Sequence, residues 1–326
     1  MQQGIGQNYQ GLNYSPRLPP AQFTADLPSQ STSRSEASYF HIHQHRLAYQ
    51  EYGAPAGKPI VYFHDSGSSR LEAAFFDSAC GLHGYRLIAV DRPGIGESDY
   101  YDIGSPRDFC DDVLALTEHL GLPSFGVMSL GAGGIFGLHL AHDYPQKVSF
   151  KLCLAGVPGS VFNESEKSSY AATCWNELTP MFIKLMVRFK HRFFPDDPGQ
   201  FVERLQRFLS YTDRKVLGDP DIYGTLALDQ QEALRNGYKG VAQDLAVCFR
   251  KLDFRLSDVH VPTVIWQGEA DRLSQRSDCE YMAARLPDVR YHLVPNKGHF
   301  FFIHRMDRVF EGLRDLLPRQ ALGKAA

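Results

Sequence analysis

The sequence lacks a C-x-x-C pair, a long apolar run and a marked excess of charge of either sign. Its six cysteines are scattered along 326 residues. Several stand in apolar segments, which is typical of reduced, buried thiols and argues against a disulfide framework or a zinc site. No stretch approaches the roughly 18 consecutive apolar residues of a transmembrane helix, so no stable membrane insertion is expected. A formal net charge of -3 gives no reason to expect nucleic acid as a partner.

The first 37 residues are poor in aliphatic side chains and rich in glutamine, serine, proline and glycine. Such a segment cannot bury enough apolar area to offset the cost of ordering its backbone, so residues 1–37 are expected to form a flexible tail. The start, MQQGIGQNYQ, has neither the positive charge nor the apolar core of a signal peptide. Together with the scattered cysteines, these features predict a cytoplasmic protein.

Beyond residue 37, short apolar runs alternate with helical patterns. The expected strands are a hairpin at 40–53 and runs at 59–64, 85–90, 124–129, 148–154, 262–268 and 289–294. The expected helices are 70–82, 106–122, 132–143, 276–286 and 300–317. Repeated strand–helix units predict an α/β fold, with a doubly wound, mostly parallel sheet of about eight strands and helices on both faces.

The alternation stops at residues 160–255, which carry helical patterns and no clear strand. We interpret this segment as a helical cap inserted into a core formed by 38–159 and 256–319, with a short tail at 320–326. A cap at this point lies over the carboxyl ends of the strands, where such sheets bind ligands. The aromatic and basic helix expected at 181–194 is interpreted as burying one face on the core rather than touching a membrane.

Five short motifs follow the expected strands in a fixed order. They are HDSGSS (64–69), DRPGIGESD (91–99), FGVMSLGAGGIFGLHLA (125–141), QGEAD (267–271) and NKGH (296–299). In this order the chain resembles the α/β-hydrolase superfamily over 39–318, and within it the capped branch related to prolyl-peptidase-like and esterase-like proteins. The resemblance implies that Asp271 is the acid and His299 the base of a catalytic triad, whose nucleophile stands at the strand–turn–helix elbow.

The chemistry explains why Asp271 and His299 stand in loops at one edge of the sheet. A histidine base must reach its nucleophile at about 2.6–3.2 Å. A carboxylate must hold the other ring nitrogen and stabilise the imidazolium. Each residue alone is equally typical of a structural role, a loop histidine or a helix N-cap. Their joint placement favours the catalytic pair.

The elbow has two possible registers. The family pattern is a small residue, any residue, the nucleophile, any residue and two glycines. With Gly131 at the nucleophile position, Ser129 is the small residue and Gly133 and Gly134 follow in place. With Ser129 as the nucleophile, the following helix slips by two residues, which turns its apolar face by about 200°. We therefore expect a vacant nucleophile position at Gly131, and Ser129 remains the alternative nucleophile.

The loop after the first core strand also departs from the family pattern. The family has glycine where this chain has Asp65, and the backbone N–H groups of Ser66 and Ala132 would form the oxyanion hole. A carboxylate beside this hole opposes the negative charge that develops there. Two interpretations stay open. In one, Asp65 turns outward, caps the loop or pairs with Arg70; in the other, it faces the pocket as an acid or a base.

Cofactor and metal signals are weak. His41, His43 and His45 alternate, but a turn between the last two breaks any common face, and the sequence offers no fourth ligand. GIGES lacks the third glycine and the distant acidic residue of a dinucleotide-binding loop. We expect neither a metal nor a cofactor.

Three functions fit these observations. The first is an enzyme in which the Asp271–His299 dyad acts on water or on a substrate proton, with the space at Gly131 admitting water or a small or medium apolar substrate. Hydrolysis, lyase and cofactor-free oxygenase chemistry fit it, and ordinary esterase activity should be absent or very weak. The second is a ligand-binding or interaction protein, and the third is a serine hydrolase that uses Ser129. No residue specifies the substrate or the oligomeric state.

Overall fold

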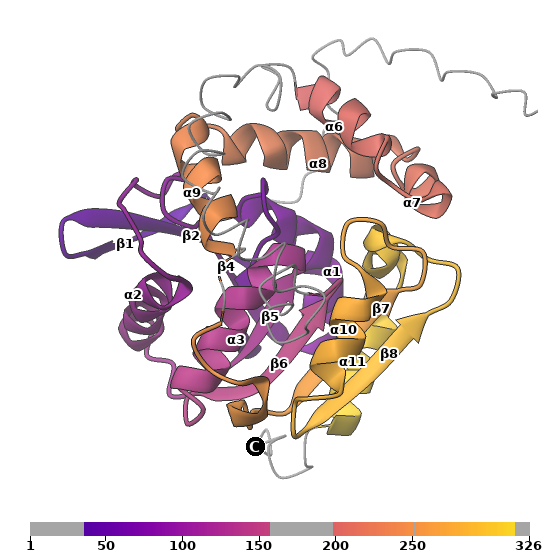
Figure 1. Cartoon of the computed structure of the whole chain (residues 1–326). Coiled ribbons are helices and arrows are strands. Elements are labelled where there is room, and N and C mark those ends of the chain that lie inside the picture. Colours follow the sequence, from indigo (N-terminus) through magenta and orange to yellow (C-terminus); the bar gives the residue numbers. More distant parts are fainter. Residues whose placement is uncertain (1–35, 157–197, 249, 251, 317–326) are drawn as a thin grey trace, which may run out of the picture. The chain divides into compact units, whose positions relative to one another are not determined.

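The computed structural model describes residues 36–156, 198–248, 250 and 252–316 (Figure 1). Its eight-stranded sheet has the order β1-β2-β4-β3-β5-β6-β7-β8. The strands are β1 (Ser38–Ile42), β2 (His45–Gly53), β3 (Lys58–Phe63), β4 (Tyr85–Val90), β5 (Phe125–Leu130), β6 (Val148–Leu154), β7 (Thr263–Gly268) and β8 (Val289–Val294). The β1–β2 hairpin is antiparallel and pairs antiparallel with β4, whereas all the other pairs are parallel. The predicted fold class is therefore confirmed.

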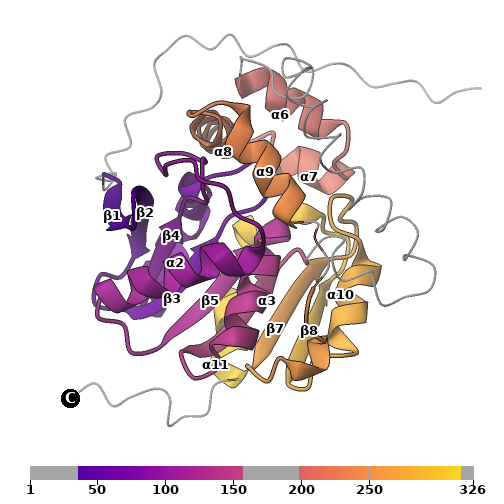
Figure 2. The same ribbon diagram turned by 60° about the vertical axis from the view of Figure 1, so that its left-hand side comes forward.

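Helices cover both faces of this sheet (Figure 2). The helical elements of the core are η1 (Arg70–Phe76), α1 (Asp77–His83), α2 (Pro106–His119), η2 (Gly131–Gly133), α3 (Gly134–Asp143), η4 (Leu256–Asp258), α10 (Arg276–Ala283), η5 (His299–His304) and α11 (Met306–Leu316). Side chains of α2, α3 and α10 pack in one apolar core. Those of α1 and α11 pack in the other core, across the sheet.

Strand β3 shows why continuous apolar runs predict the central strands. Val61 and Phe63 point into one core, and Ile60 and Tyr62 point into the other. All four side chains are fully buried. A parallel strand covered by helices on both faces needs apolar side chains at every position, so the run does not alternate with polar residues.

Two of the predicted helices are divided. The segment expected as one helix at 70–82 is a 3-10 helix, η1, followed by α1. The last helix is likewise divided into η5 and α11, with Arg305 between them. At Phe300 the backbone leaves helical geometry, and its N–H donates to Asp213 Oδ1 at 2.9 Å. An N–H group in the first turn of a helix has no local acceptor, and this one is bound by a residue 87 positions away.

The described part of the 160–255 segment contains only helices. They are α6 (Pro198–Gln206), α7 (Tyr211–Val216), α8 (Pro220–Ala233) and α9 (Tyr238–Cys248), and they lie above the carboxyl ends of the central strands (Figure 1). The division of the chain at residues 160 and 255 stays a prediction, and the helix expected at 181–194 lies outside the described residues. None of the described helices is both long and apolar enough to cross a membrane.

Buried ion pairs join these helices to the core. Arg92, in the loop after β4, binds Asp244 of α9 through Nε at 2.5 Å and Nη2 at 2.9 Å. Arg70 binds Glu232 of α8 at 2.7 Å as well as Asp91 at 2.6 Å. Arg92 is 1% exposed and Asp244 is 3% exposed. Water therefore hardly reaches either charge, and the two charges stabilise each other instead.

Replacing Asp244 by alanine is expected to lower the free energy of unfolding by about 3–5 kcal/mol, because Arg92 would keep a buried charge without its partner. Urea denaturation measures the change. Glu280→Ala is the matched control, since it breaks an exposed ion pair with Arg276 and should leave the unfolding midpoint unchanged. Equal effects of the two substitutions would contradict the expectation.

The cysteines and the histidines of the first hairpin can be compared with their predicted roles. The five cysteines within the described residues, Cys80, Cys110, Cys153, Cys248 and Cys279, are buried and free, as predicted; Cys174 lies outside this part. His43 has a φ of 52° in the turn between β1 and β2. Among the residues that the structure describes, no group of three or more His, Cys, Asp or Glu side chains is arranged so that it could hold a metal ion.

Candidate active site

The elbow between β5 and α3 brings the backbone into close contact with the loop after β3. Gly131 has a φ of +46°, the left-handed conformation that reverses the chain at the tip of the strand. A Cβ on Gly133 would lie 2.4 Å from the carbonyl oxygen of Phe63, so only glycine permits this approach. A Cβ on Gly131 would lie 2.3 Å from Asp65 Oδ1. A side chain at position 131 and the present Asp65 carboxylate exclude each other.

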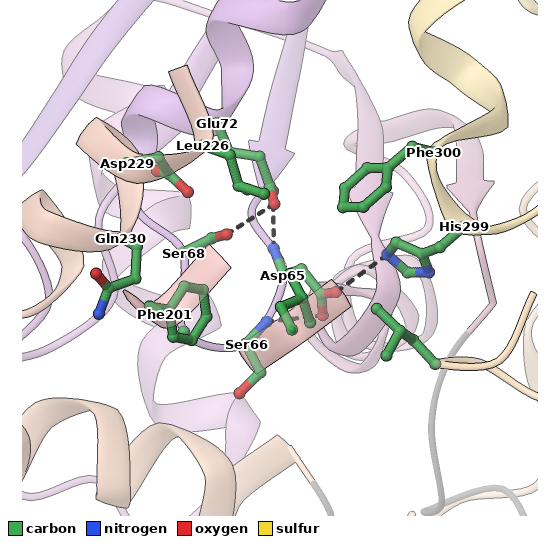
Figure 3. A pocket seen from close by; sticks show the side chains of 13 residues that line it. Asp65, Ser66, Ser68, Glu72, Phe201, Leu226, Asp229, Gln230, His299 and Phe300 are labelled. Carbon is green, nitrogen blue, oxygen red and sulfur yellow. Dashed lines mark hydrogen bonds and ion pairs between the residues drawn. The ribbon is translucent and has the colours of Figure 1, made fainter. Parts of the chain in front are cut away.

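The Asp65 carboxylate points into the site rather than outward. Its Oδ1 accepts hydrogen bonds from the backbone N–H groups of Ser66 and Ala132, both at 2.7 Å. Its Oδ2 lies 3.4 Å from Nε2 of His299 (Figure 3). The two N–H groups predicted as oxyanion donors therefore bind a carboxylate of the protein itself.

Two expectations for this region are wrong. Arg70 does not pair with Asp65, because its guanidinium binds Asp91, Glu97 and Glu232. The space beside Gly131 does not admit water or substrate either, since the Asp65 carboxylate fills it. Only the loop-capping part of the outward interpretation agrees with the geometry, through the bond from the Ser66 N–H.

Ser129 is remote from this chemistry. It lies within β5, where it pairs with Phe63 on one side and Cys153 on the other. Its side chain is fully buried, and its Oγ has no hydrogen-bond partner among the described residues. The alternative in which Ser129 attacks a substrate requires a hydrogen bond to His299, so this geometry is incompatible with it.

Asp271 and His299 meet at the carboxyl edge of the sheet. His299 Nδ1 lies 3.0 Å from Asp271 Oδ2. The other oxygen of Asp271 accepts the N–H groups of Leu273 at 2.8 Å and Ser274 at 3.0 Å. Gln267 Nε2 donates to Oδ2 at 3.2 Å. These hydrogen bonds fix the orientation of the Asp271 carboxylate, which in turn orients the imidazole of His299.

The charges of Asp65 and His299 stabilise each other, and Asp271 also stabilises the imidazolium of His299. Burial alone lowers the pKa of His299, but the carboxylates of Asp271 and Asp65 outweigh it and raise this pKa well above its usual range. Burial raises the pKa of Asp65, but the hydrogen bond and charge of His299 and the two backbone N–H groups bring it below its usual value. These shifts favour the imidazolium form of His299 beside an ionised Asp65. His299 therefore starts as a proton donor, not as a base.

The backbone around Asp65 is held from two sides. Its N–H donates to Glu72 Oε2 at 2.8 Å. Arg92, itself anchored by Asp244, donates to the carbonyl oxygens of His64 at 2.5 Å and Asp65 at 3.0 Å. Arg92 stands in the DRPGIGESD motif and Glu72 in the helix expected at 70–82, but the sequence pattern predicted a role in the site for neither residue. Only the folded loop brings these long side chains to it.

A cavity of about 70 Å³ opens beside Asp65 and His299. Its apolar wall is formed by Phe201, Leu205, Leu226, Leu273 and Phe300. Its polar wall adds Ser68, Glu72, Asp229 and Gln230, of which only Ser68 stands in one of the five motifs. Burial, reinforced by the charge of Asp229, raises the pKa of Glu72 to about 8. Burial likewise raises the pKa of Asp229 to about 7.

Comparisons with known proteins agree with this fold. Residues 23–311 match the model of the alpha/beta hydrolase family. A 2-hydroxy-6-oxo-6-phenylhexa-2,4-dienoate hydrolase from Burkholderia cepacia is 26% identical, over 76% of this chain and 83% of its own. A proline iminopeptidase from Neisseria gonorrhoeae is 22% identical, over 84% and 94%.

Among solved structures, the enol-lactonase from Burkholderia xenovorans superposes with a TM-score of 0.65 at 17% identity, covering 86% of this chain and 99% of its own. This structural likeness agrees with the family match, which extends over most of the chain. The chain belongs to the alpha/beta hydrolase family.

Proposed function

We propose that this chain is a hydrolase without a serine nucleophile, in which Asp65 attacks the substrate and the Asp271–His299 dyad transfers protons. One observation carries the proposal. Asp65 Oδ1 is bound by two backbone N–H groups, while Oδ2 faces His299 and the pocket. The substrate is a small or medium apolar molecule with an electrophilic saturated carbon, in keeping with the largely apolar wall of the cavity.

The first step is a substitution at carbon. Asp65 is ionised at neutral pH and its side chain is 22% exposed, against 2% for His299. Oδ2 forms a bond to the electrophilic carbon, and the leaving group departs with the electron pair of the bond that breaks. The product is an ester at the Asp65 carboxyl group, a covalent intermediate of the kind that carboxylate nucleophiles form.

The second step is hydrolysis of this ester. Water attacks Asp65 Cγ, and negative charge develops on Oδ1, which already lies 2.7 Å from each of two N–H donors. Donors placed at the position of the developing charge are the largest single source of stabilisation in acyl transfer. The two N–H groups of the oxyanion hole thus stabilise the negative charge that develops on the protein's own Asp65 carboxyl group.

The protonation of His299 changes with the state of Asp65. Esterification removes one of the two anionic partners that raise the pKa of His299, so the imidazolium can release its proton to water or to a basic leaving group and then act as a base. It then takes a proton from the attacking water and gives it to the departing alkoxide. The second water proton stays on the regenerated Asp65 carboxyl group and passes to His299, which restores the ion pair.

Ordinary ester or peptide hydrolysis does not fit this site. A substrate carbonyl needs the two N–H donors, and the Asp65 carboxylate already occupies them. The proposed activity therefore differs from acyl transfer by a serine, although the fold is the same.

A second candidate is a ligand-binding protein without turnover. Both oxygens of Asp65 have partners. The Asp65 carboxylate therefore occupies the site in the way that a bound carboxylate product would. In that case the pocket binds small apolar molecules, and substitution of His299 changes affinity only.

Covalent trapping separates these functions. Replacing His299 by glutamine should block the second step, so an ester on Asp65 accumulates when the protein is incubated with bromobutane or epoxybutane. Mass spectrometry of the intact protein and its peptides measures the adduct, and Asp65→Asn in the His299→Gln background is the control without a nucleophile. With the unmodified protein, turnover in water labelled with heavy oxygen should place the label in the Asp65 carboxylate. Turnover without label in Asp65 would instead favour a dyad that acts directly on water.

A further inference from the structure

A second carboxyl group lines the pocket on the side away from His299. Asp229, on α8, is fully buried, and its Oδ1 accepts the N–H of Ser69 at 2.9 Å and the hydroxyl of the same residue at 2.6 Å. Its Oδ2 has no hydrogen-bond partner among the described residues. Figure 3 shows Asp229 and His299 at opposite ends of the pocket, with Asp65 between them. The mechanism described above leaves Asp229 unused.

Substitution at carbon requires groups on opposite sides of the carbon that is attacked. The nucleophile approaches along the line of the bond that breaks, so the leaving group departs away from Asp65. His299 lies 3.4 Å from the attacking Oδ2, on the side of the nucleophile. A leaving oxygen therefore needs a proton donor on the far wall, within hydrogen-bond reach of that oxygen.

Asp229 lines the same pocket as Asp65 and His299, and its surroundings favour the protonated carboxyl group. Acidic groups face it from several elements: Glu72 of η1, Asp91 after β4, and the phenols of Tyr62 in β3 and Tyr52 in β2. Burial is the main cause that raises the pKa of Asp229 to about 7, and Asp91 contributes, although the hydroxyls of Ser69 and Ser68 oppose it. Arg70, the cation nearby, is already bound by Asp91 and Glu232. A substantial fraction of Asp229 is therefore a neutral acid near pH 7.

We propose that Asp229 is the acid that protonates a departing oxygen, and that the substrate class is an epoxide. This inference rests on the proposed function of Asp65. Asp65 Oδ2 bonds to a ring carbon, the carbon–oxygen bond of the ring breaks, and the ring oxygen takes the proton of Asp229. Asp229 recovers a proton from the imidazolium of His299, which becomes the base for the second step. The sum is one epoxide and one water converted to one diol.

A pair of substrates of similar shape tests the inference. Epoxybutane needs a proton on its leaving oxygen, whereas bromobutane releases bromide without one. In the His299→Gln background, where the Asp65 ester accumulates, adding Asp229→Asn should slow ester formation from epoxybutane by about 10²- to 10⁴-fold. Ester formation from bromobutane should change by less than about threefold on the same principle, which also reports that the variant is folded. Asp221→Asn, on the exposed face of the same helix, is the matched control and should alter neither rate.

The pH dependence of the rate of ester formation is a measurement that a purely structural role of Asp229 would not change. With Asp229 present, the rate of ester formation from epoxybutane should fall as pH rises through about 7, and bromobutane should show no such fall. Equal slowing of both reactions by Asp229→Asn, or of neither, overturns the role of Asp229. An ester from bromobutane alone in the protein with Asp229 overturns the epoxide class but leaves the proposed function intact. No ester from either compound overturns both.

Discussion

Replacing Asp65 by asparagine is expected to abolish turnover, with a loss of about 10⁶-fold in kcat, comparable to removal of the nucleophile in subtilisin. The amide has nearly the same shape and its oxygen can still accept the N–H groups of Ser66 and Ala132, so the loop should keep its fold. The amide cannot form the ester, however. Steady-state hydrolysis of epoxybutane measures the loss, and thermal unfolding measures the stability.

A mechanism in which the Asp271–His299 dyad acts directly on water predicts the opposite effect of Asp65→Asn on turnover. If the dyad acts directly on water, removing the Asp65 charge takes away one of the anions that raise the pKa of His299. The pKa of His299 would then fall, which favours the free base, and the activity of Asp65→Asn would be preserved or increased. Ser129→Ala serves as the control, since its Oγ has no hydrogen-bond partner in the described part of the chain and its loss should leave turnover unchanged.

Restoring a serine hydrolase should require two substitutions together. Gly131→Ser alone places a Cβ 2.3 Å from Asp65 Oδ1. The carboxylate must then leave its two N–H donors or the elbow must distort, so little ester hydrolysis is expected. Asp65→Gly alone opens the oxyanion hole but supplies no nucleophile. The double variant removes the clash, opens the hole and places a hydroxyl beside His299.

The double variant is expected to hydrolyse p-nitrophenyl acetate about 10³-fold faster than either single variant, since both a nucleophile and oxyanion donors contribute by such factors. The effect is strongly non-additive, as expected for residues in contact. Labelling by a fluorophosphonate should appear only in the double variant, and a further His299→Ala substitution should remove it. A single Gly131→Ser variant as active as the double would show that Asp65 does not occupy the hole in solution.

Much of the fold could be predicted because its signals are local. The central strands are buried on both faces, so segments such as 59–64 and 85–90 appear as continuous apolar runs. The loops with Asp271 and His299 follow parallel strands, whose carboxyl ends share one edge. Their proximity could therefore be expected, and the two side chains lie 3.0 Å apart. The division of the helices at 70–83 and 299–316 was not expected from their periodicity.

The order of the motifs, the mostly parallel sheet and the glycine at the tip of the elbow follow from the amino-acid sequence alone. The group that stands beside that glycine depends on the folded chain. A buried carboxylate adopts the direction in which its charge finds hydrogen-bond partners, and those of Asp65 include the N–H of Ala132, 67 positions away. The orientation of Asp229 likewise depends on Ser69, 160 positions away. Such partners come together only in the folded chain, so the spacing of residues in the sequence does not predict them.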